Sequence, residues 1–116
     1  TTAPDWAHPG QTGANYPPDD AHFGDYANFA GYMANRYKGK VAAWQIWNEP
    51  DDGVFWIGGP QPARYTKLLL AASGAIKGAD PAAMVVAGGL VANDYDFLQS
   101  IYGNGGGNSC VSVAFG

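Results

Sequence analysis

Apolar residues recur along the chain at two different spacings, which predict helices and strands in alternation. Between Ala21 and Gly39 the apolar positions fall at three- and four-residue steps, which indicates one face of an amphipathic helix. These positions are Phe23, Tyr26, Ala30, Met33 and Tyr37. Either Asp19 or Asp20 can cap the start of this helix, and Gly39 suits its exit.

Two further segments show the same helical spacing. Pro62 is well placed to begin a second helix, and Gly78 with Pro81 would end it. The apolar face of this helix consists of Tyr65, Leu68, Leu69, Ala72 and Ile76. The stretch "NDYDFLQSIYG" predicts a third and shorter helix, capped by Asn93 or Asp94 and ended by its last glycine.

Short apolar runs between these helices predict strands. The stretch "KVAAWQIW" (40–47) is too short for another helix and is rich in aromatic and branched residues, so we expect a buried strand. The stretches "AMVVAGGL" (83–90) and "CVSVAF" (110–115) predict two more. The opening "TTAP" has the character of a strand end, and a loop rich in Gly, Pro and Asp follows it to residue 20. Strands that alternate with helices predict an α/β fold with a parallel sheet.

Composition limits the possible partners. A chain of 116 residues suffices for one small domain. The net charge is −4 and the six basic residues are scattered, which argues against nucleic acid or an anionic membrane surface as partner. The apolar runs are far shorter than the roughly 20 residues of a membrane span. The first residues lack the basic start and apolar run of a signal peptide, so we expect an intracellular protein or a mature or internal piece of a longer one.

The single cysteine and the two histidines do not predict a metal site. Cys110 is alone in the chain, which excludes an internal disulfide and favours a small buried thiol. His8 and His22 both lie in loop-like sequence, without the HExxH spacing and without an evident third ligand. We therefore expect neither a metal nor another cofactor.

Glu49 is the only glutamate in the chain, and it stands where an apolar run breaks into a turn. It follows Trp47 and Asn48 at the carboxyl end of a predicted strand, which is the end where parallel α/β folds bind ligands. The apolar and aromatic residues before it would desolvate a carboxyl group and favour its protonated form, as a general acid requires. The alternative is a turn carboxylate in solvent.

The stretch "WQIWNEP" closely resembles the fourth-strand motif of clan A glycoside hydrolases, the retaining (β/α)8-barrel enzymes that include cellulase-like and β-xylosidase-like families. The resemblance continues on both sides. The segment "YANFAGYMANRYKGKVAAWQIWNEPDDGVFW" is similar to their third helix, fourth strand and following loop. The segment "PARYTKLLLAASGAIKGADPAAMVVAGGL" is similar to the fourth helix and fifth strand, and "FLQSIYGNGGGNSCVSVAFG" to the fifth helix and sixth strand. The resemblance implies that residues 1–116 form a single partial (β/α)8 (TIM) barrel domain, from the end of strand three to strand six.

The resemblance also implies roles for individual residues. Glu49 would be the acid/base, and Asn48 would hydrogen-bond the 2-hydroxyl of the sugar, unless Asn48 only terminates the strand. Trp56, on the loop after the strand, would stack on a sugar ring or pack that loop. Trp6 has the same two alternatives, whereas the tryptophans of the strand itself are expected to pack against the barrel wall.

The chain departs from the family pattern at the second carboxylate. A retaining enzyme needs a nucleophile roughly 5 Å from the acid/base, which the family places on the seventh strand. This chain has no other glutamate, and the histidine that the family usually has near the end of strand six is replaced by "VAFG". We therefore expect an internal fragment, inactive by itself, of a secreted enzyme that hydrolyses O-glycosidic bonds in β-linked polysaccharide or oligosaccharide. The alternatives are a non-catalytic carbohydrate-binding barrel and a plain structural α/β domain.

Overall fold

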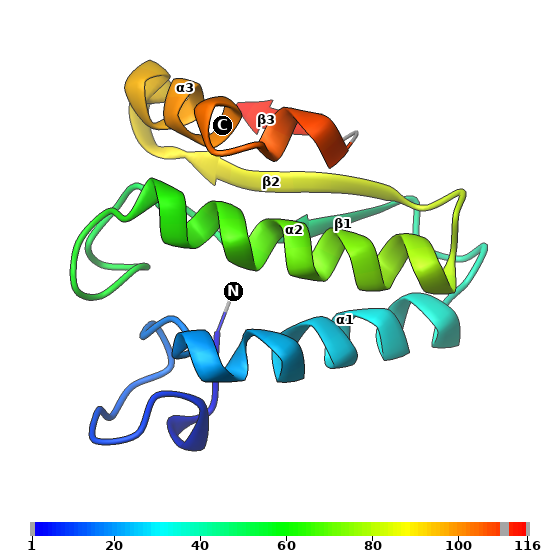
Figure 1. Cartoon of the computed structure of the whole chain (residues 1–116), viewed down its shortest axis with the longest axis horizontal. Helices are drawn as coiled ribbons and strands as arrows, with labels where there is room; N and C mark the ends of the chain where they lie inside the picture. Colours follow the sequence, from blue (N-terminus) through cyan, green and yellow to red (C-terminus); the bar gives the residue numbers. More distant parts are fainter. Residues whose placement is uncertain (1, 110–111, 116) are drawn as a thin grey trace.

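The computed structural model describes residues 2–109 and 112–115, with the backbone alone described from residue 108 onward. Helices and strands alternate along the chain, and the helices lie roughly side by side (Figure 1). The elements in chain order are η1 (Asp5–Ala7), η2 (Asp20–His22), α1 (Phe23–Arg36), β1 (Ala43–Ile46), α2 (Pro62–Ala79), β2 (Met84–Leu90), η3 (Val91–Asn93), α3 (Tyr95–Gly103), η4 (Gly106–Ser109) and β3 (Ser112–Phe115).

The three strands form one parallel sheet in the order β1-β2-β3. Ala43 of β1 lies opposite Met84 of β2, and Ile46 lies opposite Ala87. Each strand is joined to the next through a helix, and such connections are right-handed in nearly all proteins. Two right-handed connections that step in the same direction place their helices on the same face of the sheet. The chain is thus a mixed α/β structure with parallel strands, as the hydrophobic pattern predicts.

The strand residues alternate between a covered and an open face. In β1, Ile46 is buried and Trp44 partly buried, whereas Ala43 and Gln45 are exposed. Two of the four residues of β1 are therefore exposed, against the prediction of a buried strand. The face that carries Trp44 and Ile46 is turned toward the helices, and both residues contact the core.

Helix α2 is the centre of the core, and its buried face is the one that the sequence predicts. Helix α1 keeps part of its predicted face in the core, because Phe23 is buried and Tyr26 and Ala30 pack against the core. It packs on α2 through small residues, because a Cβ added at Gly31 would lie 3.2 Å from the carbonyl oxygen of Ala75, and Ala27 and Ala34 are buried. Met33, also on the predicted face, lines an open cleft, and Tyr26 borders both this cleft and the core.

The ends of the helices and the first residues correct two local predictions and confirm a third. Residues 2–4 form no strand; the N–H of Ala3 instead donates to the carbonyl of Ala14 in the N-terminal loop. Neither Asp19 nor Asp20 caps α1, because the 3₁₀ turn η2 precedes it and His22 takes the N-cap position. The cap predicted for α3 is confirmed at Asp94, whose carboxylate accepts from the N–H of Phe97 at 2.9 Å.

A buried tyrosine joins the ends of β1 and β2. The hydroxyl of Tyr65 donates to the carbonyl of Ile46 at 2.8 Å and accepts from the N–H of Gly88 at 2.7 Å. Burial raises the pKa of Tyr65 above its ordinary value, so the hydroxyl keeps the proton that it donates. Gly88 itself is tightly packed, because a Cβ there would lie 3.0 Å from Cδ of Pro50. The residues that follow β1 are thereby held against β2.

Replacing Tyr65 with phenylalanine should destabilise the fold through lost hydrogen bonds rather than lost volume. The change leaves one buried carbonyl and one buried N–H without their partner, which should lower the free energy of unfolding by about 2–4 kcal/mol. Urea unfolding followed by circular dichroism measures this. Tyr102→Phe is the matched control, because Tyr102 is 55% exposed. Equal stability of the two variants would contradict the bridging role of Tyr65.

Candidate active site at the carboxyl end of the sheet

Asn48 and Glu49 lie just beyond the end of β1, at the edge of the sheet to which the strand arrows point (Figure 1). Both side chains are partly buried. The N–H of Glu49 donates to the carbonyl of Gly89 in β2 at 3.0 Å, and its carbonyl accepts from the N–H of Asp52 at 3.0 Å. The backbone that carries Glu49 is therefore anchored on both sides: to the neighbouring strand and to the following turn.

Left-handed backbone conformations concentrate at this edge. Among the described residues, the non-glycine residues with positive φ are Trp47 (66°), Glu49 (44°), Ala92 (51°) and Asn93 (57°). The first two follow β1 and the last two follow β2. Such a conformation costs an L-residue about 1–2 kcal/mol, and it persists only where surrounding contacts enforce it. Strain of this kind is typical of functional sites.

The contacts that enforce the conformation of Trp47 are visible. Its indole N–H donates to the carbonyl of Phe55 at 2.7 Å, and the side chain is fully buried. Its ring packs edge-on against Trp56, with 5.8 Å between ring centroids. This indole therefore connects the strained backbone to the loop between β1 and α2.

Trp47 belongs to a row of aromatic rings that runs below the site. Neighbouring ring centroids are 5.8 to 6.3 Å apart, within the range of favourable aromatic contacts. The rings, in order, are Tyr26, Trp47, Trp56, Tyr65 and Phe97. Burial raises the pKa of Tyr26 to about 12, so its hydroxyl is neutral at physiological pH.

The structure places Trp56 in this row and not on the surface. Its exposed fraction is 0%, with Trp47 on one side and Tyr65 on the other. A sugar ring cannot reach a side chain without an exposed face. Packing of the loop, the alternative that the sequence left open, therefore describes Trp56, and its stacking role is corrected.

Trp6 has the opposite environment. It is 60% exposed and stands at a cleft with a volume of about 530 Å³ between the N-terminal segment, α1 and β1. Neither Asn48 nor Glu49 lines this cleft. The structure thus brings Asn48 and Glu49 together and leaves Trp6 exposed at a separate feature. Because this cleft is mostly apolar and neither residue lines it, we take the carboxyl end of the sheet, the strand edge that carries Asn48 and Glu49, as the candidate active site.

Asp51 is a site residue that the sequence pattern did not single out. Its Oδ2 accepts from the N–H of Val91 at 2.8 Å, which ties the loop after Glu49 to η3. Its Oδ1 is buried without a hydrogen-bond partner among the described residues. Burial raises the pKa of Asp51, and the nearby carboxylates of Asp94 and Asp52 add to that shift, against the lowering effect of backbone N–H groups. In the sequence, the signal for this residue was the pair of aspartates, Asp51 and Asp52, that directly follows N-E-P.

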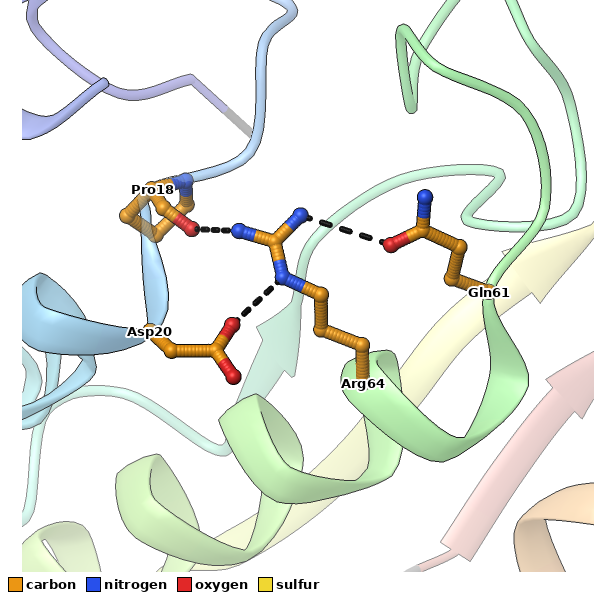
Figure 2. Close-up of polar contacts among 4 residues, drawn as sticks. All are labelled: Pro18, Asp20, Gln61 and Arg64. Atoms are coloured by element: carbon orange, nitrogen blue, oxygen red, sulfur yellow. Dashed lines mark hydrogen bonds and ion pairs between the residues drawn. The ribbon is translucent and has the colours of Figure 1, made fainter. Parts of the chain in front are cut away.

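Arg64 fastens the N-terminal loop to the first turn of α2, as Figure 2 shows. Its Nε donates to Asp20 at 2.6 Å, and Nη2 donates to the carbonyl of Pro18 at 2.6 Å. A longer contact of 3.4 Å joins Nη1 to the side chain of Gln61. The guanidinium also lies 5.8 Å from the centroid of Trp56. One side chain thereby links the loop that carries Trp6 to the packing below the strand edge.

The potential metal ligands of the described residues are spread over several elements of the fold. Within residues 2–109 and 112–115, no three side chains of metal-ligand type gather into a possible ion site. His8 is fully buried, with its ring nitrogens 3.3 Å from the carbonyl of Gln11 and 3.2 Å from that of Ala3. Cys110, predicted to be a buried thiol, lies outside the described residues.

The described helices include none that is long and apolar enough to cross a membrane. A scan against models of known protein families found no match to this chain. A search of curated proteins likewise found no matching sequence.

The raised pKa of Asp51 predicts a pH dependence of stability. A folded-state pKa above the unfolded value means that ionisation of Asp51 disfavours the folded state. Its contribution to stability is therefore fully present at low pH and is lost as pH rises through the folded-state pKa. Asparagine cannot ionise, so the stability of Asp51→Asn relative to the original chain should increase as pH rises above the ordinary aspartate pKa of about 3.9.

Urea unfolding at stepped pH measures this difference. Asp96→Asn is the control, because Asp96 is an exposed carboxylate in α3 and should show no comparable gain. Parallel pH profiles of the Asp51→Asn variant and the original chain would rule out a destabilising charge at Asp51.

Proposed function

We propose that this chain forms part of the catalytic domain of a retaining glycoside hydrolase in which Glu49 is the acid/base. The enzyme hydrolyses O-glycosidic bonds of a β-linked polysaccharide or oligosaccharide. The observation that carries the proposal is the position of the only glutamate, next to Asn48 in W-N-E-P, on a strained and anchored backbone at the carboxyl end of a parallel strand. That edge is where barrel enzymes hold their catalytic side chains.

The sheet supports a partial (β/α)8 barrel as the finer description of the fold. The strand order is sequential, β1-β2-β3, with a helix between each pair. A doubly wound sheet reverses direction at a switch point and carries helices on both faces, whereas a barrel keeps one direction and one helical face. The exposed residues on the other face of β1, Ala43 and Gln45, would then point into the barrel.

Glu49 performs two proton transfers in the proposed reaction. In the first step the carboxylic acid protonates the glycosidic oxygen while the bond from that oxygen to the anomeric carbon breaks, and a nucleophilic carboxylate forms an ester to the same carbon. In the second step the Glu49 carboxylate removes a proton from water, which attacks the anomeric carbon and releases the nucleophile. The hydrogen bond of the Glu49 backbone to Gly89 limits how far the carboxyl group can move between the steps.

Asn48 is assigned the role of binding the substrate. Its amide would hydrogen-bond the 2-hydroxyl of the sugar at the point of cleavage, a contact that strengthens as positive charge develops on the ring. Asn48 is partly buried beside the anchored Glu49 backbone. The anchored backbone fixes where the Asn48 side chain begins, and a fixed starting position favours transition-state contacts.

The nucleophile is assigned to a part of the enzyme outside these 116 residues. Glu49 is the only glutamate of the chain. The aspartate nearest in sequence, Asp51, has one carboxylate oxygen bonded to the N–H of Val91 and the other buried. A carboxyl group with both oxygens withdrawn in this way is unsuited to attack on a sugar carbon. We accordingly expect residues 1–116 alone to hydrolyse nothing.

Changing Glu49 to glutamine in the complete enzyme should remove proton transfer and keep the shape of the side chain. Turnover of natural substrates, whose leaving groups need protonation, should fall by about 10²–10⁴-fold. Aryl glycosides with activated leaving groups should lose much less in the first step. Steady-state rates on both substrate kinds measure this, with Asp96→Asn as the control. Equal losses on both kinds, or none, would remove Glu49 from the role.

Changing Asn48 to alanine should lower kcat more than it raises KM, because the contact with the 2-hydroxyl matters most in the transition state. A 2-deoxy substrate lacks that hydroxyl and should be nearly indifferent to the change. Comparing the two substrates with the original and the variant enzyme separates catalysis from structure. If the 2-deoxy substrate suffers as badly as the natural one, Asn48 only shapes the loop.

A further inference from the structure

The turn that carries Glu49 is joined to the end of β2 by two hydrogen bonds. The N–H of Glu49 donates to the carbonyl of Gly89 at 3.0 Å. The N–H of Val91, which directly follows β2, donates to Oδ2 of Asp51 at 2.8 Å. The first bond has the form of the ladder between parallel strands, whereas the second has a side chain where the ladder would have a backbone carbonyl.

A regular parallel ladder would use the carbonyl of Glu49 at this point. In such a ladder, a residue that donates to one residue of the neighbouring strand accepts, at its own carbonyl, from the N–H two positions further along that strand. Because Glu49 donates to Gly89, the ladder would bring the N–H of Val91 to the Glu49 carbonyl. That N–H instead donates to Asp51, and the Glu49 carbonyl accepts from the N–H of Asp52 at 3.0 Å. The side chain of Asp51 therefore takes the place of the Glu49 carbonyl.

This exchange of partners allows the chain to leave the sheet at Glu49. A residue that continued the ladder would have the extended backbone of a strand, whereas Glu49 has a φ of 44° and its carbonyl closes a turn. The same bond fixes Val91 directly before the second pair of left-handed residues, Ala92 and Asn93. Such conformations persist only where surrounding contacts outweigh their cost. The carboxylate of Asp51 supplies a contact that both turns share.

The surroundings of Asp51 show that its carboxyl group is held in place. Its Oδ1 is buried without a hydrogen-bond partner among the described residues. Burial raises the pKa of Asp51, and the charges of Asp94 and Asp52 add to that shift, although backbone N–H groups lower it. An acidic side chain at this position costs stability, and side chains that are kept at such a cost concentrate at functional sites.

We propose that Asp51 is a positioning residue for Glu49: its carboxylate takes the N–H of Val91 in place of the Glu49 carbonyl, and thereby fixes the turn from which Glu49 acts as acid/base. The proposal rests on the proposed function, since it assigns a further residue to that reaction. Asp51 acts through the backbone and transfers no proton. Tyr65 joins the same two strands before this point, at the carbonyl of Ile46, so it does not hold the turn that follows. Without an acceptor on residue 51, the N–H of Val91 can bond to the Glu49 carbonyl and draw the turn into the ladder.

Steady-state kinetics of the complete enzyme test the proposal with two substitutions at one position. Asp51→Ala removes the acceptor and should lower kcat on an unactivated β-linked disaccharide about 10- to 100-fold, because a small displacement of a catalytic group has an effect of this size. KM should change by less than about twofold, since Asp51 does not contact the substrate. Asp51→Asn keeps an oxygen that can accept from Val91 and should retain kcat within about twofold. Asp96→Ala, which removes an exposed carboxylate in α3, should leave kcat unchanged.

The leaving group separates a positioning role from a loss of folded enzyme. A dinitrophenyl glycoside of the same sugar needs little protonation, so Asp51→Ala should hardly slow its first step. An enzyme that had merely lost folded molecules would lose activity on both substrates equally. An original kcat in Asp51→Ala, equal losses on the two substrates, or an Asp51→Asn variant as impaired as Asp51→Ala would overturn the positioning role.

Hydrogen exchange of the complete protein, followed by mass spectrometry, reports on the turn without any need for catalysis. In Asp51→Ala the N–H of Asp52 should lose the Glu49 carbonyl, so fragments that cover residues 47–53 should exchange about tenfold faster than in the original protein. Asp51→Asn should leave the exchange of these fragments unchanged. Original exchange rates in Asp51→Ala would contradict the proposal.

Failure of the positioning role and failure of the proposed function have different signatures. If Glu49→Gln lowers turnover of the complete enzyme while Asp51→Ala changes neither kcat nor hydrogen exchange, the positioning role is wrong and the hydrolase function remains. If Asp51→Ala speeds exchange in the turn while Glu49→Gln leaves turnover unchanged, the proposed function is wrong. In that case Asp51 holds the turn but positions no acid/base.

Discussion

The two hydrogen bonds of the Tyr65 hydroxyl hold the carboxyl ends of β1 and β2 together, and the geometry of the candidate site depends on them. The hydroxyl reaches from α2 into the sheet and joins the carbonyl of Ile46 to the N–H of Gly88, at the point where β1 ends and its backbone turns into a left-handed conformation. A buried carbonyl and a buried N–H at the end of a strand need partners, and here one hydroxyl serves both. The close fit of Pro50 on Gly88 is possible because the ends of the two strands are held together in this way.

The strained residues and the aromatic row are two parts of one arrangement. Trp47 has a positive φ that its bulky side chain would normally avoid, and its indole is held by the carbonyl of Phe55 and the ring of Trp56. Trp56 in turn lies against Tyr65 and beneath Arg64. The packing that stabilises the core thus also sets the direction in which Asn48 and Glu49 leave β1. In the proposed enzyme this rigidity keeps the acid/base in place during both proton transfers.

The two faces of α1 explain how one helix contributes to both the core and the cleft. Its small residues, Ala27, Gly31 and Ala34, allow the close approach to α2, while Tyr26 and Met33 remain available to line the cleft. The cleft is therefore a consequence of helix packing through small side chains. Trp6 and Asp25 reach its exposed side from the N-terminal loop and from the first turn of α1.

The sequence by itself determined the features that depend on neighbouring residues. Hydrophobic spacing located the three helices and the parallel strands, and Asp94 was recognisable as a cap because capping is a contact over three residues. The position of Glu49 at a strand end was equally local, since Asn48 and Pro50 interrupt the apolar run beside it. These predictions needed no knowledge of which segments meet in space.

Only the tertiary structure decided the features that join distant parts of the chain. Asp20 bonds to Arg64, 44 residues away, and does not cap α1. Trp56 is buried because Trp47 and Tyr65 enclose it, whereas Trp6, with the same side chain, stays exposed. Periodicity describes which residues share a face, but it cannot say which element covers that face. Burial and partner choice depend on contacts between remote segments, which the fold alone brings together.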